Sequence, residues 1–433
     1  MRPRNLISLL LLPLAAATSA PPRVLVVGGT GRIGSAVAAH MLSQAPASIT
    51  LAGRCAERGE VAVQEVLKEQ TLSSEATLKF LQLDWRDDTA LRAAMRGVDA
   101  IVHTAGPYAD ETPDVLRAAL AERVPVYVDL SDPVEYLDEC KAIGAQAAAT
   151  SETLALCAAG AFPGLSNVLA MECIERLGAD TRVKDVDFSY FTAGLGGSGD
   201  INLYITNDGF GCPVPIYKNG EYAPSMEAGG NQRQIKFFLS EDDPSARLVG
   251  ERAVWSWPFP EGALIPRQLD GGIAGDTSVG MGTAPAIWND VMGLMVDVVP
   301  REWWRRKGWS QGLASFSKPL VDFTDLFVGE THAMRVDVTS TCGKRVSAVQ
   351  AHESFRRVVG QSCAEFTMAL LASKGLMSRG AGDMAGEIAL PAAGVFTPEG
   401  LFSSAEVRGP VLDRLLAIPG TLNAGYEEGR ANL

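Results

Sequence analysis

The chain has 433 residues, a length that predicts two or three domains and leaves ample chain to bury a core. Its composition, 47% hydrophobic and 21% charged with no repeat and no long low-complexity run, is typical of a globular protein. The net charge of −13 argues against nucleic acid as a partner, because a phosphate-binding surface needs a basic field.

The first twenty residues have the pattern of a secretory signal. Arg2 and Arg4 precede an uncharged run from Leu6 to Ala17, and small residues then lead to Pro21. This pattern predicts cleavage near Pro21, since the run is too short to span a bilayer comfortably. The alternative is an uncleaved membrane anchor. Such a signal leaves three destinations open, which are a lumenal compartment, secretion, and a plastid reached through the endomembrane system.

The cysteines indicate free thiols. There are seven, an odd number, with no C-x-x-C pair and no Cys/His cluster. We therefore predict neither a disulfide framework nor a metal site. Free thiols mildly favour a reducing compartment such as a plastid stroma.

A buried strand that runs into a glycine-rich turn is the most informative stretch of the chain. From Val24 to Gly28 no side chain is polar, as in a central parallel strand, and a helix is predicted over Ser35 to Ser43. The turn fits both G-x-G-x-x-G and G-x-x-G-x-x-G, which let a pyrophosphate approach the backbone at a helix N-terminus. The alternative is a glycine turn that only packs. The predicted cofactor-binding residues here are Gly28, Gly29, Thr30, Gly31, Arg32, Ile33 and Gly34.

The end of the second predicted strand, Ser48 to Leu51, favours NADP over NAD. NAD-binding domains place an acidic residue at this strand end, whereas this chain has Gly53 and then Arg54. A guanidinium can bind the 2′-phosphate of NADP through charge-assisted hydrogen bonds, whereas an acidic side chain would repel it. The alternative is a solvated arginine that opens the predicted helix Ala56 to Gln70. Asp84, which closes the third strand, is added to the predicted cofactor site.

The remaining strands complete an alternating β/α domain that ends near residue 160. Strands are predicted over 78–83, 98–104, 124–130 and 154–158, with helices over 112–122 and 133–149. The fourth strand leads into Ala105, Gly106, Pro107 and Tyr108, at the carboxyl edge where doubly wound sheets bind ligands. We expect Ala105, Gly106 and Pro107 to form the wall under the nicotinamide ribose.

Beyond residue 160 the pattern changes to β-rich stretches with long loops. Strands are predicted over 184–192, 333–340 and 345–352, the last two forming a hairpin, and a helix over 358–373. The predicted fold class is α/β, a Rossmann-type doubly wound parallel sheet with an inserted α+β substrate domain and a C-terminal return to the first domain. The predicted organisation is a signal over 1–20, an NADP-binding domain over 21–160, a substrate domain over 161–356 and a helical segment over 357–433.

The order and spacing of several motifs resemble the saccharopine dehydrogenase-like oxidoreductases. These are VLVVGGTGRIG, ITLAGR, VDAIVHTAGPY, VPVYVDLSD and CAAGAFPGLSN, while YFTAGLGGSG, GTAPAIWN and AMRVDV are similar to plastid-type members from photosynthetic eukaryotes. The resemblance implies a Rossmann domain and an inserted substrate domain. True saccharopine reductases carry an acidic residue and a histidine around the Pro-Gly turn, where this chain has Phe162 and Asn167. This departure implies a substrate other than saccharopine.

The candidate catalytic residues are Tyr108 and Asp129, which follow adjacent strands. Hydride transfer needs a proton donor or acceptor beside the cofactor, and both side chains could supply one. The alternatives are that Tyr108 only stacks on the cofactor and that Asp129 caps the next helix. Phe162, Phe191 and Trp288 are expected to make the substrate side apolar.

The predicted function is an NADP-dependent oxidoreductase acting on a small or lipophilic metabolite. The alternatives are a non-catalytic NADP(H)-binding sensor and a lipid-associated protein of the same fold. The stretch from Arg301 to Trp309 mixes tryptophans with cations, which suits a membrane interface or, alternatively, a packed face with solvated charges. A homodimer is also open. The tryptophans proposed for membrane contact are Trp303, Trp304 and Trp309.

Overall fold

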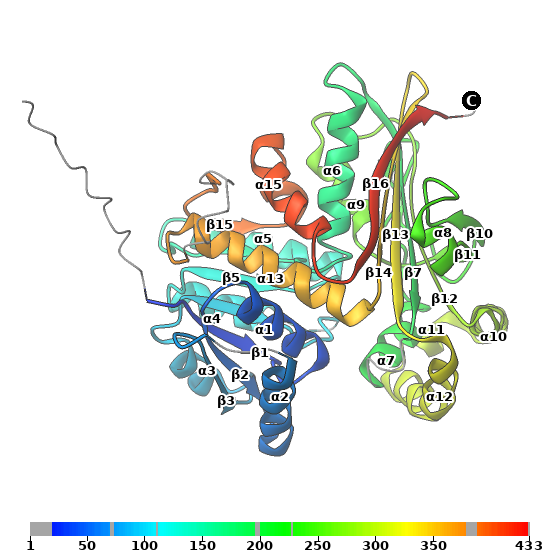
Figure 1. Cartoon of the computed structure of the whole chain (residues 1–433). Coiled ribbons are helices and arrows are strands. Elements are labelled where there is room, and N and C mark those ends of the chain that lie inside the picture. The colour runs from blue at the N-terminus through cyan, green and yellow to red at the C-terminus, as the bar shows by residue number, and fades with distance from the viewer. Residues whose placement is uncertain are drawn as a thin grey trace, which may run out of the picture.

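The computed structural model describes residues 20–69, 73–109, 111–194, 200–226, 228–377 and 388–431. Almost all of the predicted signal segment lies outside these residues. Two seven-stranded sheets dominate the structure, one in each domain (Figure 1).

The first sheet is parallel and doubly wound, as the sequence predicts. Its strand order is β15-β6-β5-β4-β1-β2-β3. Val24 and Val26 of β1 pack on one face and Leu25 and Val27 on the other, because successive side chains of a strand alternate. The strands along the chain are β1 (Arg23–Val27), β2 (Ser48–Gly53), β3 (Thr77–Gln82), β4 (Ala100–His103), β5 (Val126–Asp129) and β6 (Leu154–Leu156).

Helices cover both faces of this sheet. The apolar sides of α1 (Arg32–Gln44) and α2 (Ala56–Glu69) belong to one core. The other core contains side chains of α3 (Asp88–Met95), α4 (Asp114–Ala121) and α5 (Val134–Ala147). The helix after the glycine turn begins at Arg32, three residues before the predicted start, so its first turn lies directly at the end of β1.

The C-terminal part of the chain returns to the first domain, which confirms this feature of the predicted fold class. Helix α13 (Phe355–Ser373) packs against α1, and His40 of α1 lies 2.8 Å from the Glu365 carboxylate of α13. Beyond α13, β15 (Gly394–Phe396) pairs in parallel with β6 and forms the edge of the first sheet. The sequence did not predict β15, a three-residue strand too short to show a period.

The second sheet is mixed and has the order β10-β11-β12-β7-β13-β14-β16. The strands β13 and β14 form the predicted hairpin, and α6 (Leu165–Leu177) packs against both. The strands are β7 (Val183–Ala193), β10 (Arg233–Lys236), β11 (Glu251–Ser256), β12 (Thr277–Ala284), β13 (Thr331–Ser340), β14 (Lys344–His352) and β16 (Thr421–Arg430), and a separate two-stranded sheet contains β8 (Tyr217–Lys218) and β9 (Glu221–Tyr222).

The last strand differs from the sequence prediction. Residues 357–433 were expected to be helical and to pack on the first domain, but β16 pairs antiparallel with β14 in the second sheet. Glycines at 425 and 429 and the charged pair Glu427 and Glu428 hide the strand pattern. Because β16 is half exposed and lies at a sheet edge, pairing with β14 is the interaction that defines it.

The remaining helices belong to the second domain and the C-terminal segment. No helix among the described residues is long and apolar enough to cross a membrane. Figure 1 shows α7, α11 and α12 together at one end of the second sheet. These helices are α7 (Asp200–Gly209), α8 (Pro244–Leu248), α9 (Glu261–Gln268), α10 (Ala286–Val298), α11 (Arg301–Trp304), α12 (Lys307–Val328), α14 (Pro398–Leu401) and α15 (Ala405–Leu416).

Candidate functional site

A cavity of about 1140 Å³ lies between the two domains, at the carboxyl edge of the first sheet. The glycine turn and the ends of β2, β4 and β5 form one wall, and side chains of the second domain, including Trp257 and Phe259, form the other. This is the edge at which doubly wound sheets bind their ligands. The cavity is therefore the candidate functional site.

The glycine turn shows a different role for each glycine. Gly28 has a φ of +78°, and a Cβ there would lie 2.8 Å from the Ala105 backbone nitrogen. A Cβ at Gly34 would lie 2.7 Å from the Gly28 carbonyl oxygen, so this glycine permits close packing of α1 on the strand. Gly31 lines the cavity, and a Cβ there would meet only the Gly28 oxygen, at 3.1 Å. The turn thus leaves a space that a side chain at Gly31 would fill, and this space suits a pyrophosphate.

The cavity contains many, but not all, of the predicted site residues. Gly29 and Gly34 instead pack inside the turn, and the exposed side chains of Arg32 and Asp84 point elsewhere. The Asp84 carboxylate accepts a hydrogen bond of 3.2 Å from the Arg86 backbone nitrogen. The predicted residues that line the cavity are Gly28, Thr30, Gly31, Ile33, Arg54, Ala105, Gly106, Pro107 and Tyr108.

Three guanidinium groups line the dinucleotide side of the cavity. Arg54 and Arg58 are exposed at the end of β2 and in the first turn of α2. The Arg86 guanidinium lies 4.3 Å from the centroid of the Trp85 ring. It also forms an ion pair of 2.9 Å with the Glu111 carboxylate. Sequence reasoning missed Arg58, although its position four residues after Arg54 at a helix start could have revealed it.

Tyr108 lines the cavity, but its hydroxyl is engaged inside the protein. That hydroxyl donates to the His103 carbonyl oxygen at 2.7 Å and accepts from the Leu130 backbone nitrogen at 3.3 Å. Burial raises the pKa of Tyr108 well above its usual value, so the hydroxyl stays protonated. The arrangement fits the alternative role of a wall residue better than that of a proton donor.

Asp129 does not lie at the mouth of the cavity, contrary to the sequence prediction. Its carboxylate is fully buried and accepts hydrogen bonds from Tyr127, from Ser131 and from the Ala158 backbone nitrogen. These donors join β5 to the chain after β6. The geometry assigns Asp129 a structural role, because its oxygens are already satisfied and no cavity surface reaches them.

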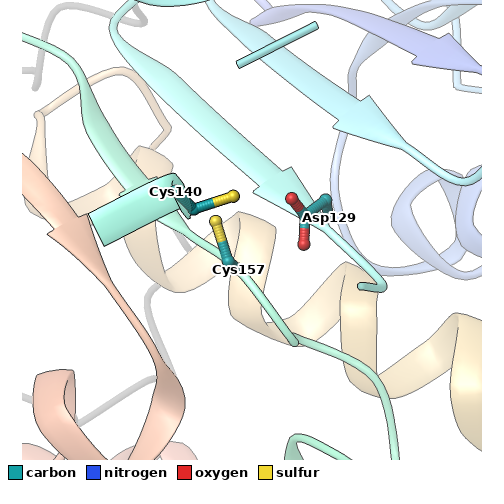
Figure 2. Close-up of side chains that lie close together, drawn as sticks. All are labelled: Asp129, Cys140 and Cys157. Atoms are coloured by element: carbon teal, nitrogen blue, oxygen red, sulfur yellow. The ribbon is translucent and has the colours of Figure 1, made fainter. Parts of the chain in front are cut away.

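Two cysteines lie beside Asp129 (Figure 2). One ligand atom each of Asp129, Cys140 and Cys157 falls within 4.8 Å of the others, and all three residues are buried. The sequence spacing of 11 and 17 residues gave no sign of this cluster, which forms only when β5, α5 and β6 pack together. Since hydrogen-bond donors already occupy the Asp129 oxygens, the cluster does not offer a cation a free carboxylate.

Asp132, three residues after Asp129, does line the cavity. Burial raises its pKa to about 6, and the neighbouring Asp129 charge acts in the same direction. A carboxyl group with a pKa near neutrality in a cleft is a candidate for proton transfer. Asp132 was not selected from the sequence, although it follows the same strand as Asp129.

The substrate side of the cavity is aromatic, and Phe162 is its centre. The Phe162 ring stacks on Tyr190 with centroids 4.6 Å apart and on His332 at 4.7 Å. Phe259 and Phe355 complete the cluster at 5.3 and 5.7 Å. Phe162, Phe259 and Phe355 themselves line the cavity, which therefore presents an apolar surface opposite the glycine turn.

Two of the three residues expected to make this side apolar lie elsewhere. Phe191 is buried in a separate core on the second sheet. Trp288 belongs to α10, and its indole nitrogen donates to the Thr324 hydroxyl at 3.0 Å. Phe162 alone of the three lines the cavity, and Trp257, Phe259 and Phe355 add further aromatic surface to it.

Beneath this aromatic cluster lies a buried polar network. The Glu261 carboxylate accepts from the Tyr190 hydroxyl at 2.6 Å and from the Ser166 hydroxyl at 2.9 Å, and burial raises its pKa to about 7. Asn167 donates to Glu399 at 2.9 Å. His332 is neutral, because burial lowers its pKa to about 3. The network fixes Tyr190, the residue on which Phe162 stacks.

Comparison with known proteins agrees with this geometry. Residues 24–156 match the family model of the saccharopine dehydrogenase NADP binding domain. The structure is similar to apo saccharopine dehydrogenase (L-Glu forming) from Saccharomyces cerevisiae, with a TM-score of 0.60 and 12% identity over 94% of this chain and 100% of that one. The first domain therefore matches an NADP-binding domain family, and the chain as a whole has the fold of saccharopine dehydrogenase.

Other solved structures are similar over a smaller part of the chain. A short-chain dehydrogenase from Sphingobium yanoikuyae in complex with NADPH has a TM-score of 0.24 and 14% identity over 31% of this chain and 70% of that one. Pen from Bacillus thuringiensis has a TM-score of 0.26 and 18% identity over 32% and 51%. No curated protein sequence matches the chain significantly.

Proposed function

We propose that this protein is an NADP-dependent oxidoreductase that acts on an apolar or ring-containing metabolite. One observation carries the proposal: a single cavity joins the glycine turn to the aromatic surface around Phe162. Its volume of about 1140 Å³ exceeds the range of roughly 300–1,000 Å³ of ordinary ligand sites. The cavity therefore has room for a dinucleotide and a second molecule.

The cations of the cavity support NADP as the preferred dinucleotide. Arg54 follows the end of β2, where an NAD-binding domain would have an acidic side chain, and Arg58 lies in the first turn of α2. Two guanidinium groups can form charge-assisted hydrogen bonds with a 2′-phosphate, which NAD lacks. The family model of the first domain points to the same cofactor.

The proposed reaction divides its tasks between cofactor and protein. The nicotinamide, when bound, supplies or accepts the hydride. Gly28, Gly31 and Ala105 bind and orient the cofactor, and the aromatic surface excludes water from the substrate side. Asp132 moves the proton, because it lines the cavity just after β5 and burial raises its pKa to about 6. It takes the role that the sequence prediction gave to Asp129.

The substrate is proposed to be lipophilic, because Phe162, Phe259 and Phe355 would contact it. Saccharopine is a poor fit. An amino-dicarboxylate needs cations on the substrate wall, whereas Phe162 and Asn167 stand at the Pro-Gly turn and the Asn167 side chain is bound to Glu399. Arg305, the second-domain arginine that lines the cavity, is already paired with Asp208.

The experiment is NADPH oxidation by the purified protein against ring compounds, isoprenoids and amino acids. The proposal predicts turnover of an apolar carbonyl, imine or alkene, and a large loss of that turnover in Asp132→Asn. Good turnover of saccharopine or its semialdehyde precursor would contradict the substrate class. NADPH binding without turnover of any compound would favour a non-catalytic sensor, a reading consistent with the internal engagement of Tyr108 and Asp129.

A further inference from the structure

Helices α10 and α12 carry most of the exposed large hydrophobic side chains of the described chain. On α12, Phe316, Leu326 and Phe327 are 83%, 79% and 76% exposed. Isolated exposed apolar residues are ordinary, but a contiguous group marks an interaction surface. We call this surface the α10–α12 face; its members are Ile287, Val291, Leu294 and Val298 of α10 and Phe316, Leu320, Phe323, Leu326 and Phe327 of α12.

The spacing shows that each helix presents one apolar stripe. The exposed residues of α10 recur at intervals of four, three and four, and Phe316, Leu320, Phe323 and Phe327 recur at the same intervals on α12. Residues so spaced share one side of a helix. The hydrogen bond from Trp288 to Thr324 joins the two helices one position away from Ile287 and Phe323, so these parts of the two stripes lie near each other.

Cations and tryptophans lie at one end of this face. Residues 301–307 contain four cations and one acid, in a chain whose net charge is −13. Trp303 is exposed, and the centroids of the Trp303 and Trp309 rings are 5.4 Å apart. The Arg306 guanidinium lies 5.0 Å from the Trp303 ring centroid. Tryptophan beside arginine or lysine is the combination that anchors proteins at the headgroup level of a bilayer.

The structure corrects the sequence prediction for this region. Trp304 is buried, and it packs beside Phe210 at 5.1 Å rather than reaching a membrane. Trp309 is half-buried, and Arg305 is paired with Asp208 at 2.6 Å. The exposed residues of the stretch are Glu302, Trp303, Arg305, Arg306, Lys307 and Gly308, while the apolar surface itself comes from α10 and α12.

We propose that the α10–α12 face binds the surface of an anionic lipid bilayer, with its phenylalanines in the acyl boundary and Arg306 and Lys307 at the headgroups. The helices would lie in the interface, as amphipathic helices with cationic flanks do. A second copy of this chain, joined through the same stripes by a two-fold axis, is the other occupant that the test distinguishes.

The face also lies on a helix that packs beside the cavity. Helix α12 packs against α7, and Ile205 and Gly209 of α7 line the cavity, as does Arg305 of the loop before α12. Burial raises the pKa of Glu111, which lines the cavity, and the positive charges of Arg86 and Lys307 oppose that rise. A bound bilayer would therefore lie beside the cavity mouth. The docking surface itself does not depend on the proposed reaction.

The test is flotation of the full chain with vesicles of phosphatidylcholine alone and of phosphatidylcholine mixed with phosphatidylserine. The proposal predicts binding that is stronger to the anionic vesicles. Combining Phe316→Ser, Phe323→Ser and Phe327→Ser should lower the partition coefficient by about a hundredfold or more. Combining Arg306→Ala and Lys307→Ala should lower binding to anionic vesicles by about tenfold or more, with little effect on neutral ones.

The matched control combines Val61→Ser and Leu248→Ser, which removes exposed apolar side chains of α2 and α8 outside the face. It should bind vesicles like the unmodified protein. Circular dichroism and NADPH binding should be unchanged in every variant, because the altered side chains are exposed and lie outside the cavity.

Hydrogen exchange locates the contact independently of the apolar N-terminal segment. Vesicles should slow exchange in peptides covering 286–298 and 307–328. Binding without protection of these peptides, or with full affinity in the phenylalanine variant, would overturn the proposal. The absence of binding to any vesicle would also overturn it. If, in addition, the unmodified protein were a dimer and the phenylalanine variant a monomer, the face would be a contact between two copies of the chain instead.

Discussion

Asp129 and Asp132 lie three residues apart at the end of β5, and only Asp132 lines the cavity. The turn through Leu130 and Ser131 separates them, since the Ser131 backbone nitrogen and hydroxyl both bind the Asp129 carboxylate, at 3.1 and 2.6 Å. The two acids therefore have different environments, and the same substitution should affect them differently.

Asp132→Asn should lower kcat for the substrate found by the NADPH assay by about 10²- to 10⁴-fold, the usual contribution of a positioned acid or base. Because the pKa of Asp132 is about 6, reduction of the substrate should slow as pH rises through about 6 and the carboxyl loses its proton. This pH dependence should disappear in the variant. NADPH affinity should change little, and unaltered kcat would remove Asp132 from the mechanism.

Asp129→Asn should instead act on stability. The amide group of asparagine cannot accept all the hydrogen bonds that reach the buried carboxylate, and an unmatched buried donor costs about 1–3 kcal/mol of unfolding free energy. Denaturant unfolding measures this change. A variant with native stability and no activity would restore the sequence prediction that Asp129 is catalytic.

Glu261 predicts a pH dependence of stability. Its folded-state pKa of about 7 lies above its ordinary value of 4.5, so the folded protein binds this proton more tightly than the unfolded chain. The resulting stabilisation is fully present below about pH 4.5 and is lost as pH rises through about 7, a change of up to about 3 kcal/mol. Glu261→Gln should flatten the pH dependence of the unfolding free energy between about pH 5 and about pH 8. Glu241→Gln, at an exposed side chain, is the control and should leave the profile unchanged.

Arg54→Ala and Arg58→Ala should each weaken NADPH binding more than NADH binding, since each removes a charge-assisted contact worth roughly 1.5–3 kcal/mol. Arg32→Ala is the matched control, because Arg32 is an exposed arginine of the same region outside the cavity. Titration calorimetry measures the affinities. Equal affinity of the unmodified protein for NADPH and NADH would contradict the NADP preference.

The N-terminal pattern predicts a mature chain that begins near Pro21. Mass spectrometry of the protein from its native cells gives its first residue directly. An intact start at Met1 or Arg2 would show that the segment is retained, and the secretory route to a lumen, to the exterior or to a plastid would lose its support.

The sequence predicted the first domain well because local patterns determine it. Buried apolar runs and the glycine turn specify the positions of β1 to β6, and one edge of a parallel sheet then collects Gly31, Arg54 and Gly106. The strands β15 and β16 escaped prediction, since each is defined by pairing with a partner distant in the chain.

The site was harder to predict for the same reason. Whether Asp129 or Asp132 faces the cavity depends on the turn between them. Whether Phe191 faces the cavity or a core depends on the side of β7 from which its side chain projects, and in the structure it projects into a core. The aromatic wall combines Phe162, Phe259 and Phe355, which are far apart in sequence. No spacing rule connects them.

The most direct test of the account is the affinity of the purified protein for NADPH before and after Gly31→Val. Gly31 lines the cavity, and its missing side chain leaves the space that the pyrophosphate is proposed to occupy. We predict one NADPH per chain in the unmodified protein and no measurable binding in the variant, with the circular dichroism spectrum preserved. Failure of the unmodified protein to bind NADPH, or undiminished binding by a folded Gly31→Val variant, would contradict the central claim that this cavity is a dinucleotide site.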